Sequence, residues 1–315
     1  MTDPSVLVHV DHLSVDAVTG DRVFPAVRDI SLDIRTSEAL AVVGESGSGK
    51  TLTALSIAGL LADNLHPHGA ITFRGKEVLG LPWKDRRALA GAGIGYIFQE
   101  PMSALHPILT VGQQIDEALR AHFTMTRTQR ADRTRELLAT VGLAATRDIA
   151  GNRIGQLSGG MRQRVMIALA ISCKPSLLIA DEPTTALDVT LQKQIMELLV
   201  RLREDMGLTL LMITHNLGLV SETCDRAAVV YAGQVVELAP TRELLSDPLH
   251  GYTQALVSCS PVLADTRRRL PTVSGTAPWL VDERTLPRDQ WDDHDLLEVS
   301  PGRWLRGHDR SGGAA

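Results

Sequence analysis

Apolar side chains recur at every second position near the start of the chain. The alternation covers residues 6–10 and 30–34, on either side of a loop rich in Asp, Thr and Gly. A period of two is the spacing expected of a strand that buries one face. The start of the chain is therefore predicted to form antiparallel strands.

Continuous apolar runs replace this alternation from residue 39 onward. Residues 39–43, Ala-Leu-Ala-Val-Val, precede a Gly-rich turn and a helical pattern from about residue 50 to residue 60. A continuous run is typical of a strand buried on both faces. Similar runs occupy residues 94–98, 177–180, 208–213 and 227–230. The last three alternate with helical stretches, which predicts a largely parallel α/β sheet.

The segment from residue 100 to residue 164 has no such runs and reads as helical. Helices are predicted at residues 111–121 and 127–141, and we interpret the segment as a helical subdomain inserted in the α/β core. Beyond residue 258 the chain is richer in Pro, Arg and Asp, with weak periodicity. The predicted domains are residues 1–258 and a C-terminal extension, residues 259–315, whose tail is partly disordered.

Composition and charge narrow the classes of function. The 315 residues are 44% hydrophobic and 22% charged, as in a soluble globular chain with a sizeable core. A net charge of -5 argues against a basic nucleic-acid-binding surface, and 3% aromatic content argues against base-stacking platforms. We therefore expect no nucleic-acid partner.

The cysteines and the N-terminus indicate a soluble cytoplasmic protein. Cys173, Cys224 and Cys259 are scattered and form no C-x-x-C pair, which suits a reducing compartment and gives no metal-site spacing. The first residues lack the basic and apolar regions of a secretory signal. Apolar runs are also far shorter than the ~18 residues that suggest a membrane span.

A phosphate loop carries the strongest chemical signal. Residues 44–51 match G-x-x-x-x-G-K-[ST]. They lie between a predicted buried strand and a predicted helix, which is the context that the motif requires. Backbone N–H groups in such a loop approach phosphates closely, and the helix dipole adds positive charge. Lys50 is expected to reach the β and γ phosphates of ATP, and the Thr51 hydroxyl to ligate Mg²⁺. The ATP-binding residues are Gly44, Glu45, Ser46, Gly47, Ser48, Gly49, Lys50 and Thr51.

An acidic pair ends the apolar run at residues 177–180. Asp181 and Glu182 are placed at the carboxyl end of the predicted strand, where open α/β sheets bind ligands. Asp181 is expected to hold Mg²⁺, and Glu182 to orient or deprotonate the attacking water. Such a pair is often only a helix cap, but its combination with a phosphate loop favours an ATPase.

A third motif narrows the class of ATPase. Leu157, Ser158, Gly159 and Gly160, followed by Met-Arg-Gln163-Arg, resemble the signature motif of ABC ATPases, and the distance to Asp181 also fits that family. The motif opens a helix, so it presents hydroxyl and N–H groups at a positive helix end. The resemblance implies that these residues, Gln163 included, bind the ATP held by a partner subunit.

Other elements of the family follow in the expected order. Gln99 resembles the Q-loop glutamine, which contacts Mg²⁺ and the attacking water. Asp188 resembles the D-loop aspartate that crosses the dimer interface. His215 resembles the switch histidine that contacts the γ-phosphate. The resemblance thus implies Glu182, His215 and Gln99 as catalytic residues, and Thr51, Gln99 and Asp181 as magnesium ligands.

Longer segments resemble one branch of the family, the oligopeptide, dipeptide and nickel importers. They are residues 98–107, 180–190, 248–256 and 269–275. Many peptide importers of this branch bind an iron–sulfur cluster through C-terminal cysteines, but no cysteine follows Cys259, so no cluster is predicted. The family's adenine-stacking aromatic residue is also missing from residues 14–17, and Phe24 is the candidate substitute.

The resemblance implies an α/β P-loop NTPase with a RecA-like core, an antiparallel β subdomain and a helical subdomain. It further implies a peripheral subunit at the cytoplasmic face of the membrane, which hydrolyses ATP to drive import of peptides, nickel, a metal chelate or an opine. Its partners would be a second ABC ATPase, identical or paralogous, transmembrane permease subunits and an external solute-binding protein. An ABC ATPase clamp of DNA repair or translation, a clamp that binds ATP without hydrolysis, and an exporter remain alternatives.

Overall fold

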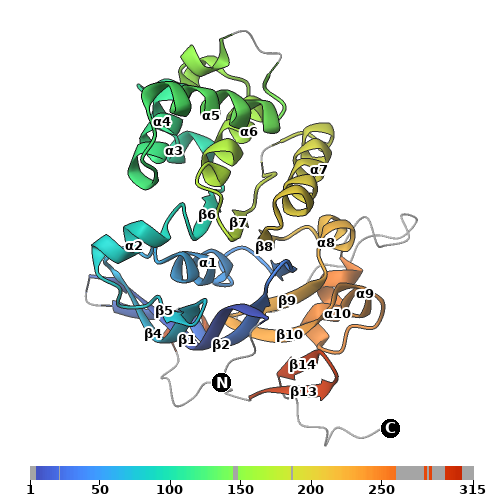
Figure 1. Cartoon of the computed structure of the whole chain (residues 1–315). Helices are drawn as coiled ribbons and strands as arrows, with labels where there is room; N and C mark the ends of the chain where they lie inside the picture. The colour runs from blue at the N-terminus through green and yellow to red at the C-terminus, as the bar shows by residue number, and fades with distance from the viewer. Residues whose placement is uncertain are drawn as a thin grey trace, which may run out of the picture. The chain divides into compact units, whose positions relative to one another are not determined.

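The chain divides into two units in a computed structural model (Figure 1). Unit 1 comprises residues 1–34, 39–79 and 214–315, and unit 2 comprises residues 35–38 and 80–213. The structure describes residues 5–20, 22–144, 148–185, 187–259, 280–281, 284–285 and 295–306.

Unit 1 contains a four-stranded sheet in the order β2-β1-β4-β5. Its strands are β1 (Val6–Thr19), β2 (Arg22–Arg35), β4 (Leu65–Phe73) and β5 (Lys76–Glu77). On β1, His9 and His12 contact Asp33 and Asp29 of β2, both at 2.6 Å, so these strands run in opposite directions. β1 and β4 are also antiparallel. The predicted antiparallel strands at the start of the chain are confirmed.

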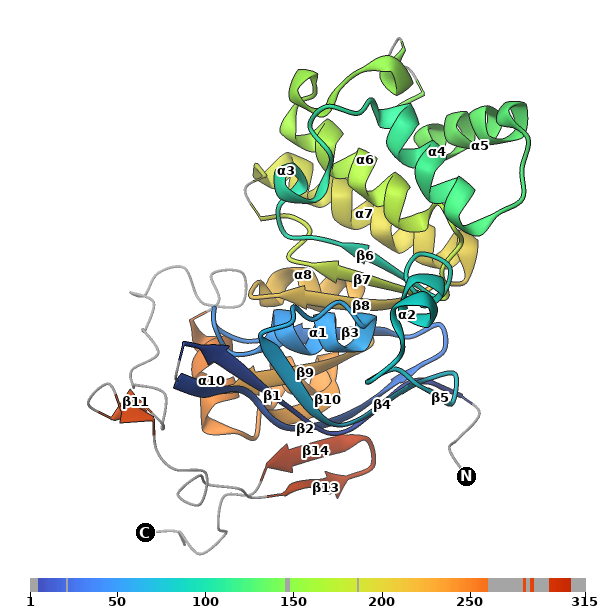
Figure 2. The same ribbon diagram turned by 90° about the vertical axis from the view of Figure 1, so that its left-hand side faces the viewer.

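A second group of strands in unit 1 carries the Gly-rich turn. β3 (Ala39–Val43) is buried along its whole length and is parallel to β9 (Arg226–Tyr231). β10 (Gln234–Pro240) runs antiparallel to β9. The helices of this unit are α1 (Lys50–Ala58), α8 (Leu217–Thr223), α9 (Thr241–Ser246) and α10 (Gly251–Ser258). Figure 2 shows α1 lying over the sheet formed by β1, β2 and β4, in agreement with its contacts to β1 and β4.

Unit 2 combines parallel strands with helices. Its strands β6 (Ile94–Ile97), β7 (Leu177–Asp181) and β8 (Thr209–Thr214) lie in the order β8-β7-β6. Its helices are α2 (Trp83–Leu89), α3 (Pro101–Ala104), α4 (Val111–His122), α5 (Arg127–Thr140), α6 (Gly159–Ile171) and α7 (Val189–Met206), with short 3-10 turns at η1 (Ile149–Gly151) and η2 (Ile154–Gln156). α4, α5 and α6 pack against one another (Figure 1). The parallel strands and the two predicted helices of residues 100–164 are therefore confirmed.

Capping explains where α4 and α5 begin. The Thr110 hydroxyl accepts the Gln113 N–H, and the Gln113 side chain accepts the Thr110 N–H. Thr126 and Gln129 form the same reciprocal pair at α5. Such capping boxes satisfy N–H groups that have no partner within the helix.

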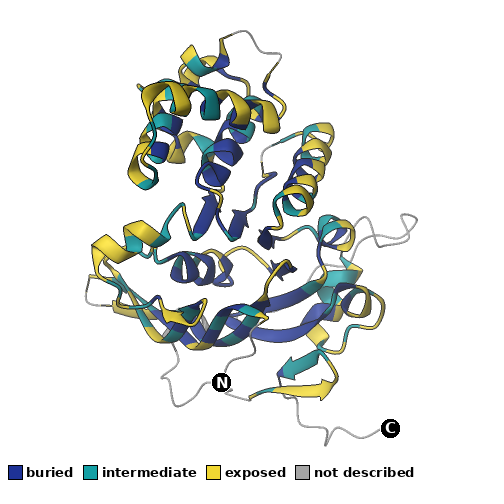
Figure 3. Cartoon of the chain, in the orientation of Figure 1, coloured by how far each residue is buried: buried dark blue, intermediate teal, exposed yellow. Residues whose placement is uncertain are grey.

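The C-terminal extension contributes a hairpin that the sequence analysis did not anticipate. β13 (Leu296–Ser300) and β14 (Arg303–Arg306) are antiparallel, and β14 pairs with β10. The Arg306 side chain is buried and donates to the carbonyls of Val235 and Asp29. Figure 3 shows that β13 of the hairpin is largely exposed, whereas β9 and β10 are buried. The predicted disordered end of the tail lies outside the described residues. Among the described helices, none is long and apolar enough to cross a membrane.

Candidate functional site

The phosphate loop of unit 1 turns where only glycine fits. Gly44 directly follows β3 with a φ of 152°, and a Cβ there would lie 2.1 Å from the Val230 carbonyl oxygen. Gly49 has a φ of 99°, and its Cβ would lie 2.8 Å from the Ala26 carbonyl oxygen. A side chain at either position would displace the backbone. α1 begins directly afterwards, at Lys50.

Lys50 occupies the centre of this loop. Its ammonium donates to the carbonyl oxygens of Gly44 at 2.9 Å and of Glu45 at 2.5 Å, and lies 3.5 Å from the Ser48 hydroxyl. The side chain is 5% exposed. The loop thus curls around one positive charge, and Thr51 lies exposed in the first turn of α1. This arrangement suits a polyanion such as a nucleoside triphosphate.

His215 lies between β8 and α8 and is exposed. The flanking residues fix the backbone there. Thr214 Oγ1 accepts the Asn216 N–H at 3.0 Å, and Asn216 Oδ1 accepts the Gly218 N–H at 3.0 Å, which caps α8. The imidazole is therefore presented by a well-defined turn.

The acidic pair of unit 2 ends β7. Asp181 is 2% exposed and accepts a hydrogen bond from the Tyr96 hydroxyl at 3.1 Å. Burial, together with the nearby Asp181 charge, raises the pKa of Tyr96, so this hydroxyl stays protonated and remains a donor. Glu182 has a φ of 45°, a conformation that costs a non-glycine residue energy and often marks functional sites. Its N–H donates to the Ile213 carbonyl at 2.9 Å, which holds the turn.

Gln99 and Glu182 meet although 83 residues separate them in the sequence. Gln99 Nε2 donates to Glu182 Oε2 at 3.1 Å, and the Thr185 hydroxyl donates to the same oxygen at 2.9 Å. Two neutral donors thus orient the Glu182 carboxylate. Thr185 was not among the predicted site residues, although it belongs to the Asp-Glu-Pro-Thr-Thr run that contains Asp181 and Glu182.

The signature residues open α6 in unit 2. The Ser158 hydroxyl accepts the Met161 N–H at 3.4 Å as the N-cap. A Cβ on Gly160 would lie 3.1 Å from a methyl carbon of Leu191, so the start of α6 packs closely on α7. Asp188 caps α7 by accepting the Leu191 N–H at 3.0 Å. Ala186, which precedes this D-loop, lies outside the described residues.

Two signature side chains are buried. Leu157 is 4% exposed and Gln163 is 3% exposed. The Gln163 amide nitrogen has no hydrogen-bond partner within the described part of the chain. Contact between Gln163 and a partner's nucleotide would require this side chain to move, and that role stays a prediction.

Comparison with known proteins decides the family. The protein-family model described as ABC transporter matches residues 27–185. A second family model, described as oligopeptide/dipeptide transporter, C-terminal region, matches residues 236–287. The dipeptide transport ATP-binding protein DppD of Haemophilus influenzae is 46% identical over 283 residues, which are 89% of this chain and 85% of that protein. The chain belongs to the ABC transporter ATP-binding family. Membership makes it an ATPase and confirms the predicted ATP binding and fold class.

Further relatives agree with this placement. The oligopeptide transport ATP-binding protein OppD of Salmonella typhimurium is 42% identical over 88% of this chain and 83% of its own length. The ATP-binding cassette MJ0796, solved as a dimer bound to ADP and phosphate, has a TM-score of 0.67 and 27% identity. That match covers 75% of this chain and 99% of the cassette. These relatives support the transport interpretation over a DNA-repair or translation clamp.

The predicted site residues of this ABC ATPase separate into two groups. The phosphate loop and His215 belong to unit 1, whereas Gln99, Asp181, Glu182, the signature and Asp188 belong to unit 2. Among the described residues, no group of three or more His, Cys, Asp or Glu side chains could by itself hold a metal ion.

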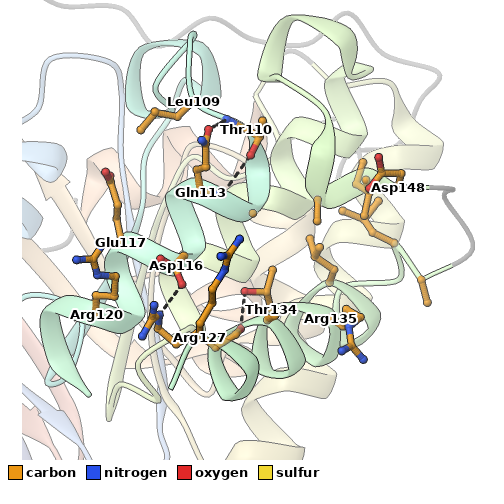
Figure 4. A pocket seen from close by; sticks show the side chains of 18 residues that line it. Leu109, Thr110, Gln113, Asp116, Glu117, Arg120, Arg127, Thr134, Arg135 and Asp148 are labelled. Carbon is orange, nitrogen blue, oxygen red and sulfur yellow. Dashed lines mark hydrogen bonds and ion pairs between the residues drawn. The ribbon is translucent and has the colours of Figure 1, made fainter. Parts of the chain in front are cut away.

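Unit 2 of this ABC ATPase also contains a cavity of about 1050 Å³. It lies among α4, α5 and η1, and Figure 4 shows side chains of both charges around it, including Glu117, Arg120 and Arg127. The Arg130 guanidinium donates to Asp116 at 2.5 Å and to the Met125 carbonyl at 2.6 Å, which ties α5 to α4.

Proposed function

We propose that this chain is the ATP-hydrolysing subunit of an importer for oligopeptides or dipeptides. The observation that carries the peptide assignment is the match of residues 236–287 to the C-terminal region of oligopeptide and dipeptide transporters. Relatives named for dipeptide and oligopeptide transport support it. In this proposal the chain works at the cytoplasmic face of the membrane, with permease subunits and an external solute-binding protein.

The proposed nucleotide site uses the phosphate loop for the triphosphate. The N–H groups of the loop and the Lys50 ammonium would bind the β and γ phosphates, and His215 would contact the γ-phosphate. Phe24, 39% exposed on β2, is the proposed adenine-stacking residue, because the same strand reaches the loop at Ala26.

The proposed metal ligands are Thr51, Asp181 and Gln99. A hydroxyl, a carboxylate and an amide supply oxygen donors, the ligand type that Mg²⁺ prefers, so these residues fit the ion. When bound with ATP, Mg²⁺ would neutralise charge on the phosphates. The Tyr96 hydroxyl, 3.1 Å from Asp181, would hold that carboxylate in place as a ligand.

Glu182 is the proposed general base. The Gln99 amide and the Thr185 hydroxyl hold one of its oxygens, and its side chain remains partly exposed. A carboxylate fixed in this way can orient a water molecule and accept its proton as the water attacks the γ-phosphorus. Gln99 would position the same water.

The proposed functional unit is a pair of ATPase chains arranged head to tail. Ser158, Gly159 and Gly160 place a hydroxyl and N–H groups at the start of α6, which suits them to the γ-phosphate of ATP on the partner. Asp188, exposed at the start of α7, would cross the interface. Val189 beside it is 81% exposed, as expected of an apolar side chain that a partner covers.

Unit 2 is the proposed contact with the permease. Met102 and Ile108 are 50% and 67% exposed, and Ile108 directly precedes Leu109, which lines the cavity of Figure 4. Apolar side chains exposed beside a cavity suit a helix from another subunit. Their closeness in sequence to Gln99 would couple that contact to hydrolysis.

Phosphate release distinguishes this proposal from a clamp that binds ATP without hydrolysing it. The chain, purified with its permease partners in liposomes, should release phosphate from Mg-ATP faster when the peptide-loaded binding protein is added. Chelation of Mg²⁺ should stop the release and serves as the control. Binding of ATP with no phosphate release under any of these conditions would favour the clamp.

A further inference from the structure

The phosphate loop is contacted by a side chain from the C-terminal part of unit 1. The Tyr252 hydroxyl accepts a hydrogen bond from the Glu45 backbone N–H at 3.0 Å. Tyr252 lies on α10, 207 residues away in the sequence, and is 8% exposed. Burial is the main cause that raises the pKa of Tyr252 to about 12, so the hydroxyl is neutral at physiological pH. One of the loop's N–H groups is therefore held by the protein itself.

The ring of Tyr252 is held in place by Tyr231, which lies at the end of β9. It packs on Tyr231 with ring centroids 4.3 Å apart and an interplanar angle of 33°. Tyr231 directly follows Val230, whose carbonyl oxygen abuts Gly44. The Gly233 N–H then donates to the Ser48 carbonyl at 3.0 Å. The turn between β9 and β10 thus supports both the loop and the tyrosine that holds it.

The start of α10 is tied in turn to β10 and the C-terminal hairpin. Glu237 is 1% exposed, and its carboxylate accepts the N–H groups of Leu249 at 3.0 Å and His250 at 2.9 Å. His250 Nδ1 accepts the Tyr252 N–H at 3.1 Å. Arg303 of β14 lies 3.7 Å from the Glu237 carboxylate. A continuous series of polar contacts therefore runs from the hairpin to Glu45.

We propose that Tyr252 is a positioning residue for the phosphate loop, through which the C-terminal region of the chain sets its affinity for nucleotide. This inference rests on the proposed role of the loop in binding ATP. A loop already held in its binding shape loses less conformational freedom when the phosphates bind. The peptide between Gly44 and Glu45 is held by Tyr252 at its N–H and by Lys50 at its carbonyl oxygen. Loss of the Tyr252 hydroxyl would remove one of these two hydrogen bonds, and part of the ordering would then have to occur on binding.

Tyr252→Phe tests the proposal, because it removes the hydroxyl and keeps the ring that packs on Tyr231. Titration calorimetry of the full chain with Mg²⁺ and a non-hydrolysable ATP analogue should show affinity about three- to tenfold weaker, the effect of one neutral hydrogen bond. In the assembled transporter, KM for ATP should rise by a similar factor while kcat changes by less than about twofold.

Thr253→Val is the matched control. Thr253 is the next residue on α10, fully buried, and its hydroxyl oxygen has no hydrogen-bond partner within the described part of the chain. Its replacement removes a hydroxyl from the same helix turn, and it should leave nucleotide affinity unchanged.

Amide hydrogen exchange gives a second readout that does not depend on the stability of a variant. In the nucleotide-free wild-type chain, the Glu45 amide should be protected, since Tyr252 accepts its hydrogen bond. An unprotected Glu45 amide, or wild-type affinity in Tyr252→Phe while Lys50→Ala loses binding, would overturn this inference and leave the ATP site standing. Absence of nucleotide binding by the wild-type chain would overturn both.

Discussion

Replacing Glu182 with glutamine is expected to lower ATP hydrolysis about 10²- to 10⁴-fold, the usual contribution of a general base. Glutamine has the same shape and can still accept the Thr185 hydroxyl, but it cannot take a proton from water. ATP binding should remain close to wild type, because Glu182 is not among the residues proposed to contact the phosphates. Phosphate release from the assembled transporter measures the first quantity, and calorimetry with Mg-ATP measures the second.

Glu197→Gln provides the control for this substitution. Glu197 is exposed on α7, in the same unit as Glu182. The Glu197→Gln substitution changes the charge by the same amount but leaves the proposed base intact. Both hydrolysis and ATP binding should therefore match those of the wild-type chain. Hydrolysis at the wild-type rate in Glu182→Gln would remove Glu182 from the mechanism.

Replacing Lys50 with alanine is expected to weaken ATP binding itself, by roughly a hundredfold or more, as befits the loss of charge-assisted hydrogen bonds to phosphate. The ammonium also donates to the carbonyls of Gly44 and Glu45, so the loop would lose the group around which it curls. Hydrolysis should fall with binding, in contrast to Glu182→Gln. Calorimetric titration with a non-hydrolysable ATP analogue gives the affinity directly.

The matched control is Lys193→Ala, which removes one positive charge from an exposed position on α7. Its ATP affinity should equal that of wild type. If Lys50→Ala bound the analogue as tightly as Lys193→Ala does, the phosphate-loop assignment would have to be abandoned.

Hydrophobic periodicity was enough to predict the elements that position the nucleotide site. β3 and β7 contain continuous apolar runs and are buried throughout. The phosphate loop directly follows β3, and Asp181 directly follows the apolar residues of β7. The capping boxes at α4 and α5 likewise depend on neighbouring residues. The buried runs are local features that the sequence alone predicts, whereas the capping boxes, although equally local, were not among the predictions.

The elements that periodicity missed depend on distant partners. β10 buries the Glu237 carboxylate, which is stabilised in the interior by N–H groups before α10 and by Arg303 of the hairpin. The hairpin has little apolar burial on β13 and is held by the pairing of β14 with β10 and by the side chains of Arg303 and Arg306. No pattern within either segment reports contacts of this kind.

The same distinction applies to the site. Lys50 and Glu182 are predicted from the motifs that contain them, and Gln99 from the family resemblance. Neither the motifs nor the resemblance gave a role to Tyr252, whose contact with Glu45 spans 207 residues. Residues that position others across the fold leave no local signature, and the three-dimensional arrangement is needed to find them.

Peptide uptake by cells reports whether ATP hydrolysis by this chain drives import. Cells from which this chain has been deleted are supplied with wild-type chain or with Glu182→Gln, and the accumulation of a labelled oligopeptide is measured. Deletion should abolish uptake through this transporter, the wild-type chain should restore it, and Glu182→Gln should not. Restoration of peptide uptake by Glu182→Gln to the wild-type level would contradict the claim that ATP hydrolysis by this chain drives import.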